Sequence, residues 1–547
     1  MSDPAIEIPV TGMTCDHCAA RVEGALRGLP GLKGHVSYRQ AVATIEDLGG
    51  ATLAEVVRAI EATGFGASLP GCRDDGPGGD RPEAPHVAVI GGGSAAFACA
   101  IRAAEQGARV TMIESRAVIG GTCVNVGCIP SKILIRAAQE ARTQAAPHVR
   151  GIRPQTPTID RAALIAQQQA RVTELRQAKY LDIVANNPAI TLRRGHARFV
   201  DGHTLSLTDA AGREERLEAD RFLIAVGASP AIPDVPGLKD APFWTSSEAL
   251  TAIEAPRHLL VLGGSAVALE LAQAFRRLGS EVTLVARGQL LSREDPALGL
   301  GLQPILEGEG MRVLTDTVLT NVHYEGGAFT LMTSRGRLAG DRLLVATGSR
   351  PNTDDLGLAD AGVRRDARGA IMIDDHLRTS APHIYAAGDC STLPRFVYVA
   401  AAAGTRAAMN MMGADARLDL EILPVVIFTD PQVASVGLTE VAARARGLAV
   451  DARTLPLENV PRALVNFDVR GFIKLVAERS SGRLLGAQIL ATDAGEIIQS
   501  AAIAIGRRMT VNELADQLFP YLTLVEGLKL CAQTFTKDIK QLSCCAG

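Results

Sequence analysis

Six of the ten cysteines in this 547-residue chain fall in three close pairs. The pairs are Cys15 with Cys18, Cys123 with Cys128, and Cys544 with Cys545. In a reducing compartment, such pairs more often carry redox chemistry or bind a metal ion than form structural disulfides. The other four cysteines stand alone, which favours small buried or incidental thiols. The spacing therefore predicts thiolate chemistry at three places in the chain.

The middle pair, Cys123 and Cys128, is separated by four residues in the segment GGTCVNVGCIPSK at residues 120–132. We expect a helix to begin there. A helix N-terminus stabilises a nearby thiolate, and the thiolate is the form that does redox and metal chemistry. This pair is therefore the candidate reactive dithiol, with a structural disulfide as the alternative.

The two outer pairs favour a soft metal ion. Cys15 and Cys18 form Cys-x-x-Cys, a spacing shared by zinc sites, thioredoxin-like chemistry and soft-metal transfer. Structural zinc needs four ligands, and residues 1–68 hold no second cysteine pair or histidine cluster, whereas two thiolates suffice for Hg(II) or Cu(I). The adjacent Cys544 and Cys545 cannot easily form a relaxed disulfide, but they can pass a metal ion onward. For this last pair, a redox relay or an incidental tail is the alternative.

A glycine-rich turn stands before the middle pair and indicates what positions it. Gly91, Gly93 and Ala96 fit the pattern G-x-G-x-x-G/A after the apolar strand expected at residues 87–90. Such a turn lets the backbone approach a pyrophosphate and lets helix and strand pack closely. Glu114 lies 23 residues after Gly91, at the end of the next expected strand, where a carboxylate would bind an adenosine ribose. Together they predict a dinucleotide site.

A second turn of this kind contains Gly263 and Ser265 after an apolar strand expected at residues 259–262. The corresponding later position holds Ala286 with Arg287 beside it, so the ribose-binding acid is missing and a cation is adjacent. A carboxylate would repel a 2′-phosphate, whereas arginine can bind it. The pattern favours NADPH over NADH, and a solvated surface charge at Arg287 is the alternative.

Composition bears on the possible partners of the protein and on its compartment. A formal charge of −3 gives no electrostatic reason to expect nucleic acid or an anionic membrane as a partner. We find no apolar run long enough for a membrane-spanning helix and no secretory signal, so the cytoplasm is the expected compartment.

The segment at residues 120–132 resembles the active-site signature of the flavin disulfide oxidoreductases, the family of glutathione reductase and dihydrolipoamide dehydrogenase. Residues 225–227, 346–352 and 386–389 also resemble family motifs, and the likeness covers about residues 85–540. It implies that Cys128 lies beside a flavin and that Cys123 is the outer, interchange thiol.

The resemblance also implies the cofactors and their contacts. FAD would be held by Gly91, Gly93, Ala96, Glu114, Gly121, Thr122, Lys132, Ala197, Asp389 and Val397. NADPH would be held by Gly263, Ser265, Glu270 and Arg287.

One departure from the family pattern bears on the substrate. Disulfide reductases of the family carry a His-Pro-Thr-x-x-Glu segment near the C-terminus, whose histidine protonates the departing thiolate. Here Glu526 remains, but Tyr521 stands where the histidine should be. Without that general acid, reduction of an organic disulfide should be poor.

The whole set of features resembles the mercury-reducing branch of this family, and residues 1–68 resemble the heavy-metal-associated domain. The resemblance implies an NADPH-dependent reduction of Hg(II) to Hg(0), with the ion passed from Cys15 and Cys18 to the C-terminal pair and then to the dithiol. Tyr521 and Tyr180 would line its path, although each could be an ordinary packing residue. The branch also implies a homodimer and a possible hand-over from a membrane mercury transporter.

The expected architecture is α/β, with several separate cores because the chain is too long for one. The expected divisions are a βαββαβ ferredoxin-like metal-binding domain at 1–68, a flexible linker at 69–84, a Rossmann-like FAD domain with the dithiol at 85–225, a Rossmann-like NADPH domain at 226–350, a central domain completing the FAD site at 351–420, and an α+β dimerisation domain with the Cys-Cys tail at 421–547.

Three other functions stay open from the sequence. The first is a flavin disulfide reductase acting on a small disulfide. The second is a metal-binding chaperone whose flavin unit is a redox sensor. The third is a reductase of another soft ion such as Au(III) or Cu(II), since thiolates discriminate little among such ions.

Overall fold

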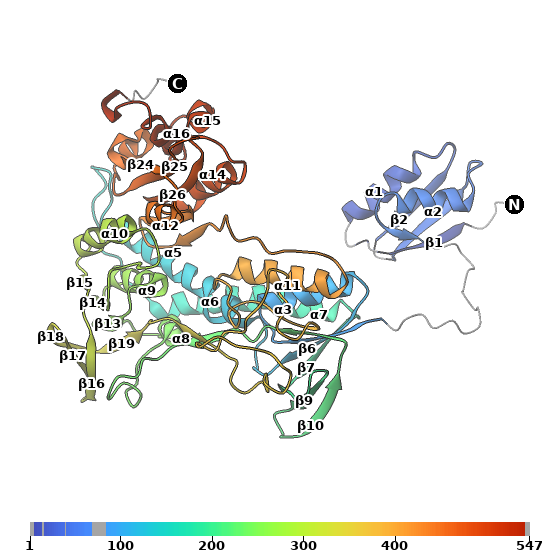
Figure 1. Cartoon of the computed structure of the whole chain (residues 1–547), viewed down its shortest axis with the longest axis horizontal. Coiled ribbons are helices and arrows are strands. Elements are labelled where there is room, and N and C mark those ends of the chain that lie inside the picture. Colours follow the sequence, from blue (N-terminus) through green and yellow to red (C-terminus); the bar gives the residue numbers. More distant parts are fainter. Residues whose placement is uncertain (1–4, 12, 14–15, 39, 68–83, 542–547) are drawn as a thin grey trace. The chain divides into compact units, whose positions relative to one another are not determined.

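The structure is a computed structural model, and it describes residues 5–11, 13, 16–38, 40–67 and 84–541 (Figure 1). The predicted metal ligands Cys15, Cys544 and Cys545 lie outside the described residues. The chain divides into two compact units, Met1–Ala84 and Pro85–Gly547, which are described separately below.

The first unit is a four-stranded antiparallel sheet with two helices. Its elements are β1 (Ile6–Thr11), α1 (Asp16–Leu26), β2 (Lys33–Ser37), β3 (Val42–Asp47), α2 (Leu53–Glu61) and β4 (Gly66–Ala67), with the strands in the order β2-β3-β1-β4. Ile8 and Val10 alternate with exposed Glu7 and Pro9, as expected of a strand with one buried face. The predicted βαββαβ fold is confirmed.

Helix α1 ends at Leu26. Gly28 and Pro30 follow directly, and both residues oppose continuation of a helix: glycine through its backbone freedom, and proline by disfavouring helical backbone at the residue before it. The chain turns there instead, with Leu29 N donating to Leu26 O at 3.1 Å.

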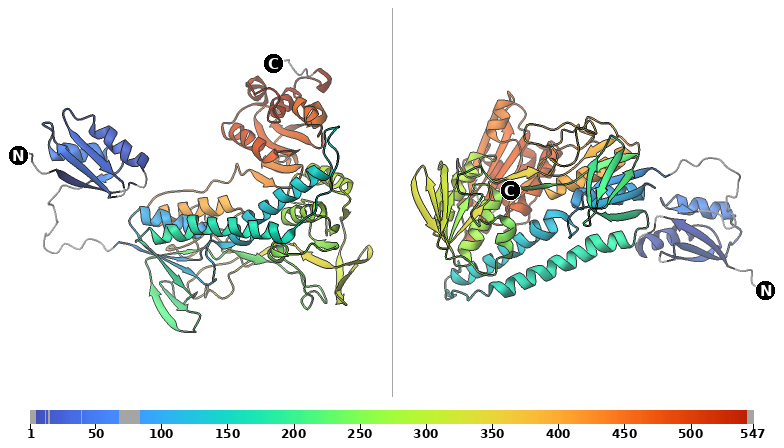
Figure 2. Two further views of the ribbon diagram at one scale, coloured as in Figure 1. Left: turned by 180° about the vertical axis from the view of Figure 1, so that it is seen from behind. Right: turned by 90° about the horizontal axis from the view of Figure 1, so that it is seen from below.

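The second unit begins with a parallel five-stranded sheet in the order β21-β11-β5-β6-β7. Its strands are β5 (His86–Ile90), β6 (Arg109–Glu114), β7 (Ile190–Arg194), β11 (Arg221–Ile224) and β21 (Ile384–Ala386). Its helices are α3 (Ser94–Glu105), α4 (Gly121–Val126), α5 (Cys128–Ala145), α6 (Arg161–Arg176), the π-helical turn η1 (Gln177–Leu181), α7 (Asp182–Ala185) and α11 (Val397–Met411). Helices α5 and α6 run side by side, as Figure 2 shows.

A second parallel sheet, in the order β15-β14-β13-β19, forms the next Rossmann-like domain. It contains α8 (Ser246–Thr251), β13 (His258–Leu262), α9 (Ala266–Arg277), β14 (Glu281–Val285), α10 (Pro296–Gly308), β15 (Arg312–Leu314) and β19 (Arg342–Val345). Smaller antiparallel sheets join the two domains or flank them: β8 (His196–Phe199), β9 (Thr204–Thr208) and β10 (Glu214–Glu218); β12 (Ala228–Pro230) and β20 (Ser349–Pro351); and β16 (Leu319–Glu325), β17 (Ala328–Thr333) and β18 (Gly336–Gly340).

The C-terminal region is an antiparallel five-stranded sheet, β22-β23-β26-β25-β24, covered by helices. Its elements are β22 (Val425–Ile427), β23 (Gln432–Gly437), α12 (Glu440–Ala445), β24 (Val450–Pro456), η2 (Leu457–Asn459), α13 (Pro461–Val465), β25 (Phe472–Glu478), β26 (Leu484–Ala491), α14 (Ala494–Gly506), α15 (Val511–Asp516), α16 (Glu526–Gln533) and η3 (Ile539–Gln541). Two Rossmann-like domains and an α+β domain confirm the predicted fold class. Among the described residues, no helix is both long and apolar enough to cross a membrane.

Candidate active site

The first glycine turn lies between β5 and α3 and brings the backbone of two segments into close contact. Gly91 has φ +124°, and a Cβ atom there would stand 2.3 Å from the carbonyl oxygen of Ala225. Ala225 is the first residue of the Ala-Val-Gly motif that follows β11, so the turn and this motif meet at the ends of adjacent parallel strands. A side chain at residue 91 would clash with this backbone. Glycine avoids the clash and so allows the close approach of a pyrophosphate.

A cleft of about 380 Å³ opens beside this turn. That volume lies in the range of small-molecule and cofactor sites. Ten of the residues expected to act on FAD or metal line it: Gly91, Gly93, Glu114, Gly121, Thr122, Cys123, Cys128, Ala197, Asp389 and Val397. Ala96 lies beneath it, fully buried in α3.

Two carboxylates and one cation stand in the walls of the cleft. Glu114 is 6% exposed at the end of β6 and accepts a hydrogen bond from the backbone N–H of Arg116 at 2.8 Å. Burial raises the pKa of Asp389, and the nearby Arg395 guanidinium opposes that rise. Arg395 also lines the cleft. It was not predicted from the sequence, because no motif marks it. Buried carboxylates need hydrogen-bond donors, and the hydroxyls of a dinucleotide supply them, so the walls fit such a group.

The dithiol occupies the junction of two helices. Cys123 lies within the short helix α4, and Cys128 is the first residue of α5, with Gly127 between them. Helices do begin in this segment as predicted, but there are two of them, because the chain breaks at Gly127. Both thiols are half-buried and free of disulfides. Cys128 thus lies at the N-terminus of an 18-residue helix, where a thiolate is stabilised.

A hydrogen bond between the two thiols shifts their pKa values in opposite directions. A hydrogen bond from Cys123, helped by the charge of Lys132, lowers the pKa of Cys128 to about 7. The same hydrogen bond, together with burial, raises the pKa of Cys123. The reduced pair therefore holds one thiolate, on Cys128, near neutral pH.

Tyr180 lies at the edge of this site, on the π-helical turn η1. Its ring packs edge-on against Phe97 with centroids 4.8 Å apart, and its hydroxyl is hydrogen-bonded to Ser94, which lines the cleft. Burial is the largest cause of its raised pKa, and the charges of Cys123 and Cys128 add to it. π-Helical turns are frequent at functional sites, and this one brings the tyrosine beside the dithiol.

Asn125 and Arg176 connect that turn to the dithiol loop, and neither residue was predicted from the sequence. Asn125 Nδ2 donates to the carbonyl oxygens of Ile119 and Gly121 at 2.9 and 2.8 Å. Its Oδ1 accepts from Arg176 Nη1 at 3.1 Å, directly before η1. Asn125 stands inside the family signature and could have been chosen from it, whereas nothing in the sequence marks Arg176.

The second glycine turn repeats the geometry of the first. Gly263 has φ +139°, and a Cβ atom there would stand 2.3 Å from the carbonyl oxygen of Ala346. Ser265 directly precedes α9, and Arg287 is exposed two residues after β14. An exposed cation at this strand end fits a 2′-phosphate, and no carboxylate stands at Ala286 to repel it.

Lys132 and Glu270 connect the two cofactor regions. Lys132 Nζ lies 2.7 Å from Glu270 Oε2 and 4.6 Å from the centre of the Phe428 ring. Glu270 Oε1 accepts a hydrogen bond from the backbone N–H of Phe428 at 2.9 Å. The pair thus joins the dithiol helix α5, the nucleotide-domain helix α9 and the end of β22.

Five of the predicted metal-handling positions are not among the described residues that line this cleft: Tyr521 and Cys18 are described elsewhere, and Cys15, Cys544 and Cys545 lie outside the described residues. Tyr521 stands in the loop before α16, 56% exposed, and is not among the described residues that line the cleft. Cys18 is half-buried in α1 of the first unit. One carboxylate oxygen of Glu526 is buried with no hydrogen-bond partner among the described residues.

Comparison with known proteins gives the same assignment as the geometry. Residues 85–404 match the family described as pyridine nucleotide-disulphide oxidoreductase, and residues 423–532 match its dimerisation domain. A mercuric reductase of Acidithiobacillus ferrooxidans is 56% identical over 544 residues, 99% of each chain. One from Shewanella putrefaciens is 54% identical over 556 residues, covering 99% of this chain and 100% of that one.

Solved structures agree. The Cu(II) complex of the HOCl-induced flavoprotein disulfide reductase RclA from Escherichia coli superimposes with a TM-score of 0.75 at 29% identity, over 83% of this chain and 100% of that one. LpdA from Mycobacterium tuberculosis gives 0.74 at 30% identity, with the same coverage of both chains. The chain therefore belongs to the pyridine nucleotide-disulphide oxidoreductase family and, within it, to the mercuric reductases.

Proposed function

We propose that this chain is a mercury(II) reductase that uses FAD and NADPH to reduce thiolate-bound Hg(II) to Hg(0). The observation that carries the proposal is a half-buried dithiol, Cys123 and Cys128, in the wall of a dinucleotide cleft. Tyr521 stands where disulfide reductases carry their acid, so the same dithiol suits a metal ion better than an organic disulfide.

The reaction balances as NADPH plus Hg(II) giving NADP⁺, Hg(0) and one proton. FAD held in the cleft would supply the redox chemistry, accepting a hydride from NADPH and passing two electrons to the metal. The chain's own part is to hold the ion: Cys128 offers a thiolate near neutral pH, and Cys123 becomes the second ligand after losing its proton. Lys132 lies close enough to the dithiol to favour the thiolate form of Cys128.

We also propose a route by which Hg(II) reaches the dithiol. Cys15 and Cys18 bind Hg(II) and pass it to Cys544 and Cys545, which deliver it to the dithiol. Each exchange replaces one thiolate ligand by another, which a two-coordinate soft ion allows. Tyr180 guides the last step with its hydroxyl, and Tyr521 contributes from the C-terminal domain.

The setting of the enzyme is also proposed. The match of residues 423–532 to the dimerisation domain supports a homodimer. The proposal places the dimer in the cytoplasm, where it receives Hg(II) from a membrane mercury transporter as a thiol complex.

The decisive experiment measures NADPH consumption and Hg(0) release with Hg(II) in excess thiol. Wild type is compared with the double variant Cys544→Ala/Cys545→Ala, using Hg(II) presented as a small and as a bulky thiol complex. We expect the double variant to lose turnover with the bulky complex, and Cys72→Ala, a lone cysteine of the linker, serves as the control. Undiminished turnover in the double variant would refute delivery by the tail.

The same assay separates the other candidate functions. Oxidation of NADPH by oxidised glutathione but not by Hg(II) would identify a disulfide reductase. Stoichiometric Hg(II) binding without turnover would identify a chaperone. The assay is repeated with Cu(II) in place of Hg(II), because the related RclA structure is a Cu(II) complex. NADPH consumption with Cu(II) but not with Hg(II) would identify Cu(II) as the substrate.

A further inference from the structure

One side of helix α9 holds a segment of the C-terminal region. Glu270, Gln273 and Arg277 are spaced by three and four residues, so their side chains project from the same side of the helix on successive turns. All three are almost fully buried. Each of them hydrogen-bonds to residues 428–430, the stretch that follows β22.

The first two contacts bind the backbone of that segment. Glu270 accepts the N–H of Phe428 at 2.9 Å. Gln273 pairs with Asp430 in both directions, since its Oε1 accepts the N–H and its Nε2 donates to the carbonyl oxygen, both at 2.8 Å. These bonds fix the backbone whatever the side chains of the segment are.

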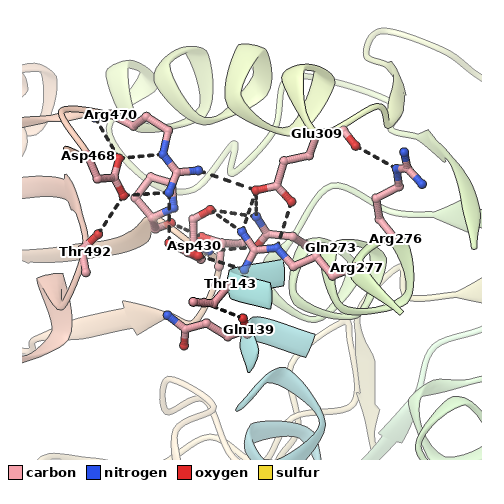
Figure 3. Close-up of polar contacts among 12 residues, drawn as sticks. Gln139, Thr143, Gln273, Arg276, Arg277, Glu309, Asp430, Asp468, Arg470 and Thr492 are labelled. Carbon is pink, nitrogen blue, oxygen red and sulfur yellow. Dashed lines mark hydrogen bonds and ion pairs between the residues drawn. The ribbon is translucent and has the colours of Figure 1, made fainter. Parts of the chain in front are cut away.

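The third contact is an ion-pair network around Arg277 (Figure 3). Arg277 donates in a fork to both carboxylate oxygens of Glu309, at 2.6 and 2.9 Å, and through Nη1 to Asp430 Oδ2 at 2.8 Å. Arg470 extends the network from Asp430 to Asp468. The side chains of Arg277 and Glu309 are each 4% exposed, so a partner left alone there would be a buried unpaired charge.

The contacts between α9 and residues 428–430 connect the two cofactor regions. Helix α9 begins at the second glycine turn, at Ser265, so its position sets the position of the nicotinamide-binding domain. Phe428, whose backbone N–H is bound by Glu270 of α9, lies against Lys132 on the dithiol helix. Residues 428–430 therefore contact both the nucleotide-domain helix α9 and Lys132 of the dithiol helix, beside the direct ion pair between Lys132 and Glu270.

We propose that Gln273 and Arg277 are positioning residues for hydride transfer, because they hold residues 428–430 against α9 and so fix the nucleotide domain relative to Lys132 and the dithiol helix. The inference rests on the proposed function. The step moves a hydride, two electrons with one proton, from C4 of the nicotinamide to the flavin and leaves NADP⁺. Its rate depends steeply on distance, and a misplacement of about 1 Å can cost about 100-fold.

The test uses the holoenzyme without mercury, so it is independent of whether Hg(II) is the substrate. Flavin reduction by NADPH is followed by rapid mixing in wild type, Gln273→Leu and Arg277→Met, with C4-deuterated NADPH as a second substrate. We expect the rate constant of hydride transfer to fall on the order of 10- to 100-fold, with the isotope effect retained and the Kd of NADPH within about twofold. Hydrogen exchange at the Phe428 and Asp430 amides, measured on the same proteins, should rise in both variants.

Arg257→Met is the matched control, since this arginine belongs to the same domain and its side chain is 87% exposed. It should leave both hydride transfer and amide exchange unchanged. If Arg277→Met fails to accumulate as a flavoprotein, Arg277→Lys decides, because it keeps the charge and loses the fork to Glu309. Hydride transfer within about twofold of wild type, in variants whose amide protection is lost, would overturn the proposal, and so would unchanged protection of both amides.

Discussion

Replacing Gly91 by alanine tests whether the first glycine turn is built for the cofactor. The new methyl group would stand 2.3 Å from the carbonyl oxygen of Ala225, which is 1.1 Å short of the 3.4 Å where ordinary contacts begin. Ala225 cannot easily withdraw, because its N–H donates to the carbonyl oxygen of Ile90 at 2.8 Å in the parallel sheet. The substitution therefore pushes the turn itself into the cleft.

The expected free-energy cost has two parts. A positive φ costs a non-glycine residue roughly 1–2 kcal/mol, and overpacking against fixed backbone adds about 1–3 kcal/mol. Gly107→Ala separates the two, because Gly107 also has a positive φ of +88° but nothing lies within 4 Å of its Cβ position. The clash alone, about 1–3 kcal/mol, corresponds to a Kd for FAD weakened roughly 5- to 150-fold if it falls on cofactor binding.

The assay is titration of the flavin-free protein with FAD, followed by flavin fluorescence, for wild type and both variants. Urea unfolding of the same proteins reports how much of the cost falls on stability instead. We expect Gly107→Ala to bind FAD nearly as wild type does, and Gly91→Ala to bind it far more weakly. Equal Kd values for the two variants would refute the argument that close approach at Gly91 serves the cofactor.

Three further outcomes are expected. Lys132→Met should raise the pKa of Cys128 above about 7, because the ammonium that favours the thiolate is gone, so alkylation of the reduced enzyme should reach half its maximal rate at a higher pH. Tyr180→Phe should slow Hg(II) turnover while changing the stability of the fold by only about 0.5–1.5 kcal/mol, since the packing on Phe97 remains and one hydrogen bond is lost. Removal of residues 1–80 should leave the rate with small Hg(II)–thiol complexes unchanged, because a tethered donor raises effective concentration only; loss of turnover would contradict this.

Much of the cofactor cleft could be predicted from the sequence because its determinants are local. The turn at Gly91 needs small residues at fixed spacing, and Glu114 follows as the end of the next strand. Cys128 stands at a helix start for the same local reason. The break at Gly127, which puts Cys123 in a separate short helix, was not predicted, since helical spacing alone does not reveal it.

Other parts of the site depend on contacts between distant segments. Arg176 lies 51 residues from Asn125 along the chain, and its side chain resembles that of any exposed arginine until the fold brings the two together. Phe428 is 158 residues from Glu270. No periodicity or spacing rule covers such distances.

Short stretches of sequence were enough to predict the chemistry: three cysteine pairs, two glycine-rich turns, Ala286 beside Arg287 where an acid would bind the ribose, and Tyr521 in place of a histidine. How the residues of the cleft come together depends on the tertiary fold. Strand β21 joins the first parallel sheet beside β11, although it follows β5 by nearly 300 residues along the chain. It thereby brings Asp389 to the same cleft as Gly91. Turns and helix starts follow from short-range sterics and hydrogen bonds, whereas sheet order and buried ion pairs follow from the packing of the whole unit.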